Sequence, residues 1–212
     1  MKFPRMFLFL VISFSISFGQ DLKHIPLPPP QTGIGKPLMQ ALKLRQSSRS
    51  FDSKPLPLQE LSNLLWAADG INRSENGKRT APSAMNWQEI DLYVMMQSGT
   101  SMYDAKSNSL LQINEKDLRE ATGKQSFVKE APLNLVYIAD EKRMTRASEE
   151  DKLRWSSADA GFIAQNVYLY CASQGLAVVV RGMVDREALA KELKLRPEQK
   201  IILSQTVGYP KQ

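Results

Sequence analysis

The second half of the sequence holds the pattern that most restricts the fold. Residues 132–139 (PLNLVYIA) form a nearly continuous apolar run of strand length, which is typical of a strand in the middle of a sheet. Helical spacing of apolar residues follows over 148–173, and Gly175 marks the end of that helix. The other elements predicted in this half are a strand, a helix and a strand, at 176–180, 186–193 and 200–208. Strands and helices therefore alternate in an α+β pattern.

The first half adds elements of the same kinds. Helices are predicted from Pro37 and from about Pro57, followed by a strand at 90–96, two short strands joined by a turn at 103–109, and a short helix at 115–121. The 212 residues are 42% hydrophobic and 24% charged, which suits a single domain with a sizeable core at 35–212. No G-x-G-x-x-G motif opens a helix after a strand, so the all-parallel dinucleotide-binding fold is not favoured.

Residues 1–20 have the three parts of a secretory signal peptide. Lys2 and Arg5 precede an apolar run at 6–18, and small residues follow before the chain becomes polar. The apolar run is short for a membrane span, although an uncleaved anchor is the alternative. We therefore expect a cleaved signal, an exported protein that is periplasmic or secreted, and no stable membrane insertion after cleavage.

Residues 21–34 are rich in proline. The sequence IPLPPP at 25–30 cannot join a helix or an inner strand, because proline lacks the backbone N–H group. This segment is predicted to be an extended tether that leads into the domain. It could instead wrap along the domain surface.

The composition excludes several classes of site. With one histidine and one cysteine, a conventional zinc or iron site and a histidine-based catalytic triad are close to excluded. Cys171 lies in an apolar helical stretch and is predicted to be a small core residue. The formal net charge of +6 is interleaved with acidic residues, so it favours small anionic ligands modestly and gives no reason to expect nucleic acid as a partner.

Two segments near the ends of the domain could bind a ligand. Residues 45–49 (RQSSR) offer two guanidinium groups and two hydroxyl groups near a helix end, which suits a phosphate monoester. A solvated basic surface is the alternative for this segment. At 180–183 (VRGM) a buried strand ends at a glycine, which lets backbone N–H groups approach a ligand.

The third such segment is the loop at 79–89 (RTAPSAMNWQE), between two apolar stretches. Proline and small residues make it a poor helix and a poor strand. It carries Ser83, Asn86 and Gln88, whose side chains can donate and accept hydrogen bonds at the edge of a planar ligand. An ordinary surface connection is the alternative.

Taken together, these segments resemble the FMN-dependent nitroreductase superfamily over roughly residues 35–210. The resemblance rests on the order and spacing of several motifs: RQSSRSF, APSAMNWQ, the long helix with Asp159 and Gln165-Asn166, GLAVVVRG and VGYP. Within the superfamily, LLWAADGINR followed by GKRTAPS is most similar to the branch that includes azoline-oxidising dehydrogenases.

The resemblance implies a nitroreductase-like α+β fold, with a central mixed β-sheet flanked by helices, an intertwined homodimer and bound FMN. Contacts to the FMN phosphate are implied for Arg45 and Ser47, and a position near the ribityl chain and the pyrimidine edge is implied for Arg49. A loop that reaches the flavin from the other subunit is implied for Pro82, Ser83, Ala84 and Asn86. Backbone approach to flavin N5 and O4 is implied for Arg181 and Gly182, and a polar flavin contact for Gln125.

The implied activity is hydride transfer through flavin N5 to nitroaromatic, quinone or similar small-molecule acceptors, with NAD(P)H or another compound as electron donor. An azoline-type substrate dehydrogenase is one alternative, and a flavin-binding protein without rapid turnover is another. The sequence leaves the physiological substrate and donor open.

The N-terminal segment gives the first testable prediction. Because the apolar run ends where small residues begin, residues 1 to about 20 should be missing from protein exported by a secreting host. N-terminal sequencing of the exported fraction measures this. Recovery of intact Met1 in the membrane fraction would identify an anchor instead.

Overall fold

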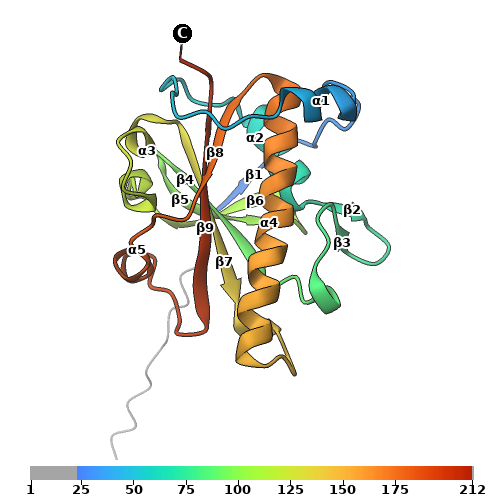
Figure 1. Cartoon of the computed structure of the whole chain (residues 1–212), viewed down its shortest axis with the longest axis vertical. Helices are drawn as coiled ribbons and strands as arrows, with labels where there is room; N and C mark the ends of the chain where they lie inside the picture. Colours follow the sequence, from blue (N-terminus) through green and yellow to red (C-terminus); the bar gives the residue numbers. More distant parts are fainter. Residues whose placement is uncertain (1–22, 212) are drawn as a thin grey trace, which may run out of the picture.

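The computed structural model describes residues 23–211, which form one sheet packed against helices (Figure 1). The sheet has seven strands in the order β1-β6-β5-β4-β7-β9-β8. Their bounds are β1 His24–Pro26, β4 Ile90–Met96, β5 Gly99–Asp104, β6 Ser109–Asn114, β7 Leu133–Asp140, β8 Ala177–Arg181 and β9 Gln199–Gly208. A separate two-stranded ribbon consists of β2 Ile71–Arg73 and β3 Lys78–Arg79. The α+β class, with a sheet flanked by helices, is confirmed.

Within the described chain, every hydrogen-bonded pair of neighbouring strands in the large sheet is antiparallel. β7 and β8 run parallel to each other, but β9 lies between them and is antiparallel to both. The two parallel strands are therefore not hydrogen-bonded to each other, because β9, the last strand of the described chain, lies between them.

The helices are α1 Leu38–Leu44, α2 Leu58–Asp69, α3 Phe127–Glu130, α4 Glu149–Gln174 and α5 Arg186–Glu192, with short 3-10 turns η1 Ala84–Asn86, η2 Arg119–Thr122 and η3 Glu141–Arg143. α4 begins where the Ser148 side chain accepts a hydrogen bond from the Asp151 N–H, and it ends at Gly175, whose φ of 76° suits glycine. No helix within residues 23–211 is long and apolar enough to cross a bilayer.

The helix expected at 115–121 is wrong. Asn114 Oδ1 accepts the Lys116 N–H, and Asp117 Oδ1 accepts the Arg119 N–H at 3.1 Å, so side chains satisfy the backbone in place of helical hydrogen bonds. Only the turn η2 forms there. Asparagine and aspartate compete with the helix at this point, and the apolar residues alone do not show it.

Strand β7 is buried on both faces. Leu135 and Tyr137 pack into the cluster formed with α2 and α4, while Val136 and Ile138 pack into a second cluster with α5 on the opposite side. Figure 1 shows α4 on one side of the sheet and α5 on the other. The continuous apolar run at 132–139 follows from this two-sided burial. Cys171 is a buried core residue, as predicted.

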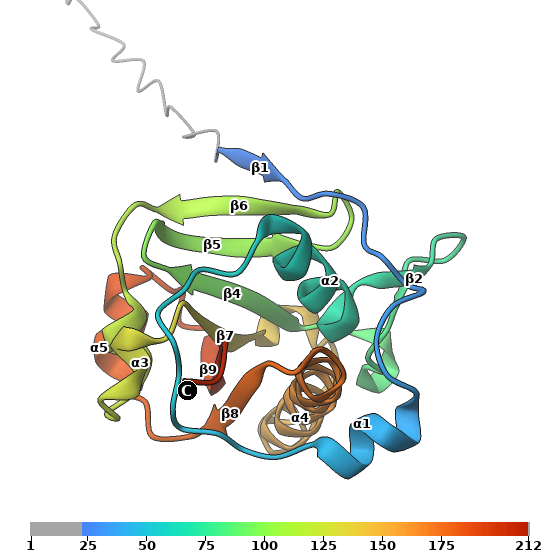
Figure 2. The same ribbon diagram turned by 90° about the horizontal axis from the view of Figure 1, so that it is seen from above.

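The proline-rich segment packs along the domain. β1 pairs with β6 at the edge of the sheet, and Figure 2 shows the chain continuing from there past β2 to α1. Leu27 is 7% exposed and belongs to the main core. The carbonyl of Pro28 accepts a hydrogen bond from Ser62 Oγ of α2, and the Gln31 N–H donates to Asn63 Oδ1 at 2.8 Å. The segment therefore wraps along the surface, which was the alternative to an extended tether.

Leu27 allows a test of this packing. Leu27→Ala should lower the free energy of unfolding by about 2 kcal/mol or more, because the change leaves a cavity in the core. Leu58→Ala is the matched control, since Leu58 is 47% exposed, and should cost far less. Urea unfolding of both variants measures the difference. Equal small effects would show that the segment does not contribute to the core.

Candidate functional site

The basic segment at 45–49 lies between the end of α1 and strand β8. The Tyr168 hydroxyl of α4 joins the two, because it is 2.8 Å from Ser47 Oγ and accepts the Val180 N–H at 2.9 Å. The guanidinium of Arg45 lies 5.3 Å from the centre of the Tyr168 ring. Arg45 is half-buried, while Ser47 and Arg49 are exposed. The segment is thus fixed in place with its polar groups available.

Arg181 has a side chain that turns into the protein. Its guanidinium donates to Thr122 O at 2.7 Å, to Asn134 Oδ1 at 2.9 Å and to Thr206 Oγ1 at 3.0 Å. Burial lowers the pKa of Arg181 to about 10. The side chain therefore stabilises the junction of β7, β8 and β9, and only the backbone of Arg181 and Gly182 remains for a ligand. Gly182 is exposed, and a Cβ there would have open space around it.

Gln125 belongs to the same region. A Cβ added to Gly123 would lie 1.9 Å from Arg181 Nη1 and 2.9 Å from Gln125 Oε1, so these two side chains meet over Gly123. Gln125 Oε1 is buried without a hydrogen-bond partner in the described residues. A buried amide oxygen without a partner is costly, which indicates that a donor of a ligand could complete it.

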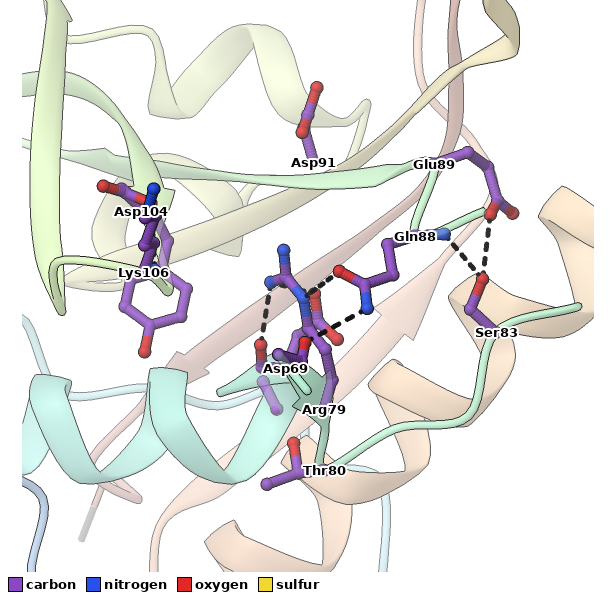
Figure 3. Close-up of polar contacts among 12 residues, drawn as sticks. Asp69, Arg79, Thr80, Ser83, Gln88, Glu89, Asp91, Asp104 and Lys106 are labelled. Atoms are coloured by element: carbon purple, nitrogen blue, oxygen red, sulfur yellow. Dashed lines mark hydrogen bonds and ion pairs between the residues drawn. The ribbon is translucent and has the colours of Figure 1, made fainter. Parts of the chain in front are cut away.

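The loop at 79–89 is fixed at its base by Arg79 (Figure 3). Arg79 Nη1 is 2.9 Å from Asp69 Oδ2 of α2, and Arg79 Nε donates to Gln88 Oε1 at 3.1 Å. Burial raises the pKa of Asp69 to about 7, and the charge of Arg79 opposes this shift. Gln88 Nε2 also donates to Gly77 O, so Gln88 is occupied in holding the loop against the β2-β3 ribbon.

The tip of the loop is the turn η1, which rests on α4. The Ala84 N–H donates to Asp159 Oδ2 at 2.8 Å, and the Ser83 hydroxyl accepts the Gln88 N–H at 2.8 Å. A cavity of about 210 Å³ lies beneath the loop, lined in part by Pro82, Asn86 and Ile163. Its floor includes three carboxyl groups, from Asp69, Glu89 and Asp159.

Sequence reasoning missed Asp69 and Glu89 as parts of this region. Asp69 lies in a segment predicted to be a helix, and Glu89 lies in a segment predicted to be a loop. Nothing in the sequence around an isolated acidic residue indicates that its side chain is buried. Asp159 belongs to a sequence motif, but the motif assigns it no role.

The structure gathers the expected site residues into two groups. The first group lies along β8: residues 45–49 run beside the strand, where the Ser48 N–H donates to Val178 O, and Gln125, Arg181 and Gly182 lie at its end. The second group is the loop on α4, with Pro82, Ser83, Ala84 and Asn86. The first group contacts α4 at Tyr168, and the second contacts it at Asp159. These two residues are nine positions apart, which is about 14 Å along the helix axis at a rise of about 1.5 Å per residue. Within one chain the two groups therefore contact different levels of the helix.

Comparison with known proteins identifies the family. Residues 42–209 match the sequence model of the Nitroreductase family, which is most of the chain. The chain belongs to the nitroreductase family. The resemblance inferred from the sequence is confirmed at this level, and membership supports an oxidoreductase. The similarity to the azoline-oxidising branch stays a prediction.

Relatives support the same family. A candidate nitroreductase of Methanocaldococcus jannaschii is 33% identical over 162 residues, which cover 72% of this chain and 81% of that protein. A crystal structure of a candidate nitroreductase from Ralstonia eutropha is 46% identical, with a TM-score of 0.86 over 92% of each chain. The NADPH:FMN oxidoreductase of Vibrio harveyi, solved with NAD+, is 20% identical and shares the fold, with a TM-score of 0.63 over 82% of this chain and 69% of that one.

Arg181 provides a test of the junction at the end of β8. Arg181→Lys should lower the free energy of unfolding by about 2 to 4 kcal/mol, because an ammonium cannot reproduce the geometry of the guanidinium hydrogen bonds. Arg154→Lys is the control, since Arg154 is exposed and pairs only with surface carboxylates, and should change stability by about 0.5 kcal/mol or less. Equal losses in chemical unfolding would contradict this role of Arg181.

Proposed function

We propose that this nitroreductase-family protein is an exported, homodimeric, FMN-dependent oxidoreductase. It would pass hydride through flavin N5 from NAD(P)H or another donor to nitroaromatic, quinone or similar acceptors. The observation that carries the proposal is the group of residues around the end of β8. These groups are the half-buried guanidinium of Arg45, the exposed hydroxyl of Ser47 and the unpartnered buried amide oxygen of Gln125. The strand itself ends next to Gly182, which is exposed.

These residues fit the parts of FMN. Arg45 and Ser47 offer a cation and a hydroxyl to a phosphate group. Gln125 Oε1 lacks a hydrogen-bond donor, and the N–H of a flavin pyrimidine ring is a donor. Arg49 is exposed nearby in sequence and would place positive charge beside that ring. When bound, FMN would supply the redox chemistry, and the chain would supply binding, charge and exclusion of water.

Two exposed apolar surfaces support the dimer. On α1, Leu38 and Met39 are 61% and 76% exposed, and on α4, Trp155 and Phe162 are 40% and 46% exposed. Large apolar side chains on neighbouring helices are typical of an interface between subunits. In the proposed dimer, the loop at 82–86 of one subunit reaches the FMN held by residues 45–49 of the other, which accounts for the separation of the two groups along α4.

Export affects the choice of electron donor. Nicotinamide cofactors are scarce outside the cytoplasm, so an exported enzyme would rely on another donor there. Such an enzyme can still accept hydride from NADPH in the test tube, which makes NADPH a usable probe.

The visible spectrum of the purified mature protein tests the function. Flavin absorption bands are expected, and anaerobic NADPH should bleach them until a quinone is added. Arg45→Ala should weaken FMN binding by about 1.5 to 3 kcal/mol, which is the scale of one charged hydrogen bond, and leave the circular dichroism spectrum unchanged. A colourless protein that does not bind added FMN would refute the proposal, and flavin that NADPH does not bleach would indicate a carrier without rapid turnover.

The shared site has its own test. Arg45→Glu and Asn86→Asp should each abolish FMN binding in a pure dimer. If both subunits build each site, a mixed dimer has one site with both defects and one with neither, so binding should partly return after the variants are unfolded and refolded together. Confirmed mixed dimers that bind no better than either parent would show that each site forms within one chain.

A further inference from the structure

Four carboxyl groups lie close to one another around the base of the loop, and only two of them have a basic partner. Among residues 23–211, the ion pairs here are Asp69 with Arg79 at 2.9 Å and Asp91 with Arg143 at 2.7 Å. Neither Glu89 nor Asp159 forms an ion pair with a basic side chain of the described chain. Arg143 donates a hydrogen bond to the backbone carbonyl of Glu89 and not to its carboxyl group. The Glu89 and Asp159 carboxyls therefore have to be stabilised in another way.

Glu89 and Asp159 are 0% and 2% exposed. Glu89 Oε2 accepts a hydrogen bond from Ser83 Oγ at 3.3 Å, while Glu89 Oε1 has no hydrogen-bond partner among the described residues. Glu89 and Asp159 line the same cavity, and adjacent loop residues bond to them: the Ser83 hydroxyl donates to Glu89 and the Ala84 N–H donates to Asp159. Two carboxyl groups can form a hydrogen bond only when one of them holds a proton, and two buried anions without a cation would be very costly.

The loop that these residues hold is strained. Met85, Asn86 and Gln88 have φ angles of 50°, 56° and 47°, which side chains other than glycine seldom adopt. Such conformations cost about 1 to 3 kcal/mol each and persist only where surrounding contacts hold them. The contact that joins the strained tip to the rigid helix is the bond from the Ala84 N–H to Asp159.

We propose that Glu89 and Asp159 are positioning residues that share one proton, and that this proton holds the loop at 82–86 in place on α4. Loss of the proton would leave two negative charges side by side in a buried site. The loop would then move so that water reaches Glu89. For flavin binding the inference rests on the proposed function, whereas the attachment of the loop to α4 does not.

The electrostatic surroundings agree with a transition near neutral pH. Burial raises the pKa of Glu89 to about 7, and the charge of Asp159 acts in the same direction. The other charged residues that line this cavity are Asp69, Arg73, Lys78 and Arg79, and Asp91 of β4 and Arg143 of η3 lie beside it. Asp69 pairs with Arg79, and Asp91 pairs with Arg143. A raised carboxyl pKa means that the closed loop binds the proton more tightly than the open loop, so the closed state is favoured at low pH and weakens as pH rises through about 7.

Hydrogen exchange of the Ala84 amide, corrected for its intrinsic rate at each pH, tests the proposal without any flavin. If the open loop has an ordinary glutamate pKa, protection of this amide should fall about tenfold between about pH 6 and about pH 8. In Glu89→Gln the side-chain amide can donate to Asp159 permanently, so protection should stay high at both pH values. Protection should also stay high at both pH values in Asp159→Asn. The asparagine amide group can donate to Glu89, while its oxygen still accepts the Ala84 N–H.

Asp69→Asn is the matched control, since Asp69 lines the same cavity and its pKa is also raised by burial. This variant should keep the pH dependence of the native protein. Protection that does not change with pH in the native protein, or that falls equally in Glu89→Gln and Asp159→Asn, would overturn the proposal. A transition removed by Asp69→Asn alone would assign the proton to Asp69 and would overturn it as well.

FMN binding gives a second readout. The affinity of the native dimer for FMN should fall as pH rises from about 6 to about 8, and the affinity of Glu89→Gln should not. If FMN does not bind at any pH while the exchange of Ala84 still follows the expected pattern, the proposed function fails and the shared proton stands. If FMN binds with the same pH dependence in both proteins, the loop proton has no part in binding.

Discussion

The packing of α4 against the sheet is the contact on which both groups of site residues depend. One face of this helix places Ile163, Val167 and Cys171 in the main core, so its position is fixed by burial. Its polar contacts then lie at set heights: Tyr168 touches the basic segment and β8, and Asp159 touches the loop. Because a helix is rigid over this length, the two groups keep their separation.

Buried charge is handled in different ways in different parts of the fold. Within residues 23–211, Arg181 pairs with no carboxylate and is stabilised by oxygen atoms of Thr122, Asn134 and Thr206. Asp69 is stabilised by an arginine. Glu89 forms no ion pair with the described residues and accepts one side-chain hydrogen bond, from Ser83, so protonation is the remaining way to stabilise its buried carboxyl. Burial of a charged group is unfavourable in both places. Arg181 meets this with fixed hydrogen bonds, whereas in the proposed mechanism Glu89 meets it with a proton and therefore responds to pH.

Much of the fold could be predicted because its signals are local. The apolar run of β7 and the helical spacing of α4, with Ser148 and Gly175 at its ends, identify these elements within a residue or two. The predicted helix at 115–121 failed because Asn114 and Asp117 bond to the backbone, a competition that apolar spacing does not record. The sequence does not decide whether the proline-rich segment is a free tether or packs along the domain. Both arrangements need an extended chain, and the same residues favour an extended chain in either case.

The sequence by itself determined the α+β class, the order of the main elements, the family resemblance and the segments that could bind a ligand, because each of these is encoded in residues that are neighbours along the chain. Only the tertiary structure decided that the Arg181 side chain points inward, that Gln125 has an unpartnered oxygen within the described residues, and that Glu89 and Asp159 line one cavity without forming ion pairs there. Those facts depend on burial and on contacts between residues far apart in the sequence, such as Arg181 and Thr122, which are 59 positions apart. Burial and distant contacts are set by how helices and strands pack, and no local pattern of residue types contains them.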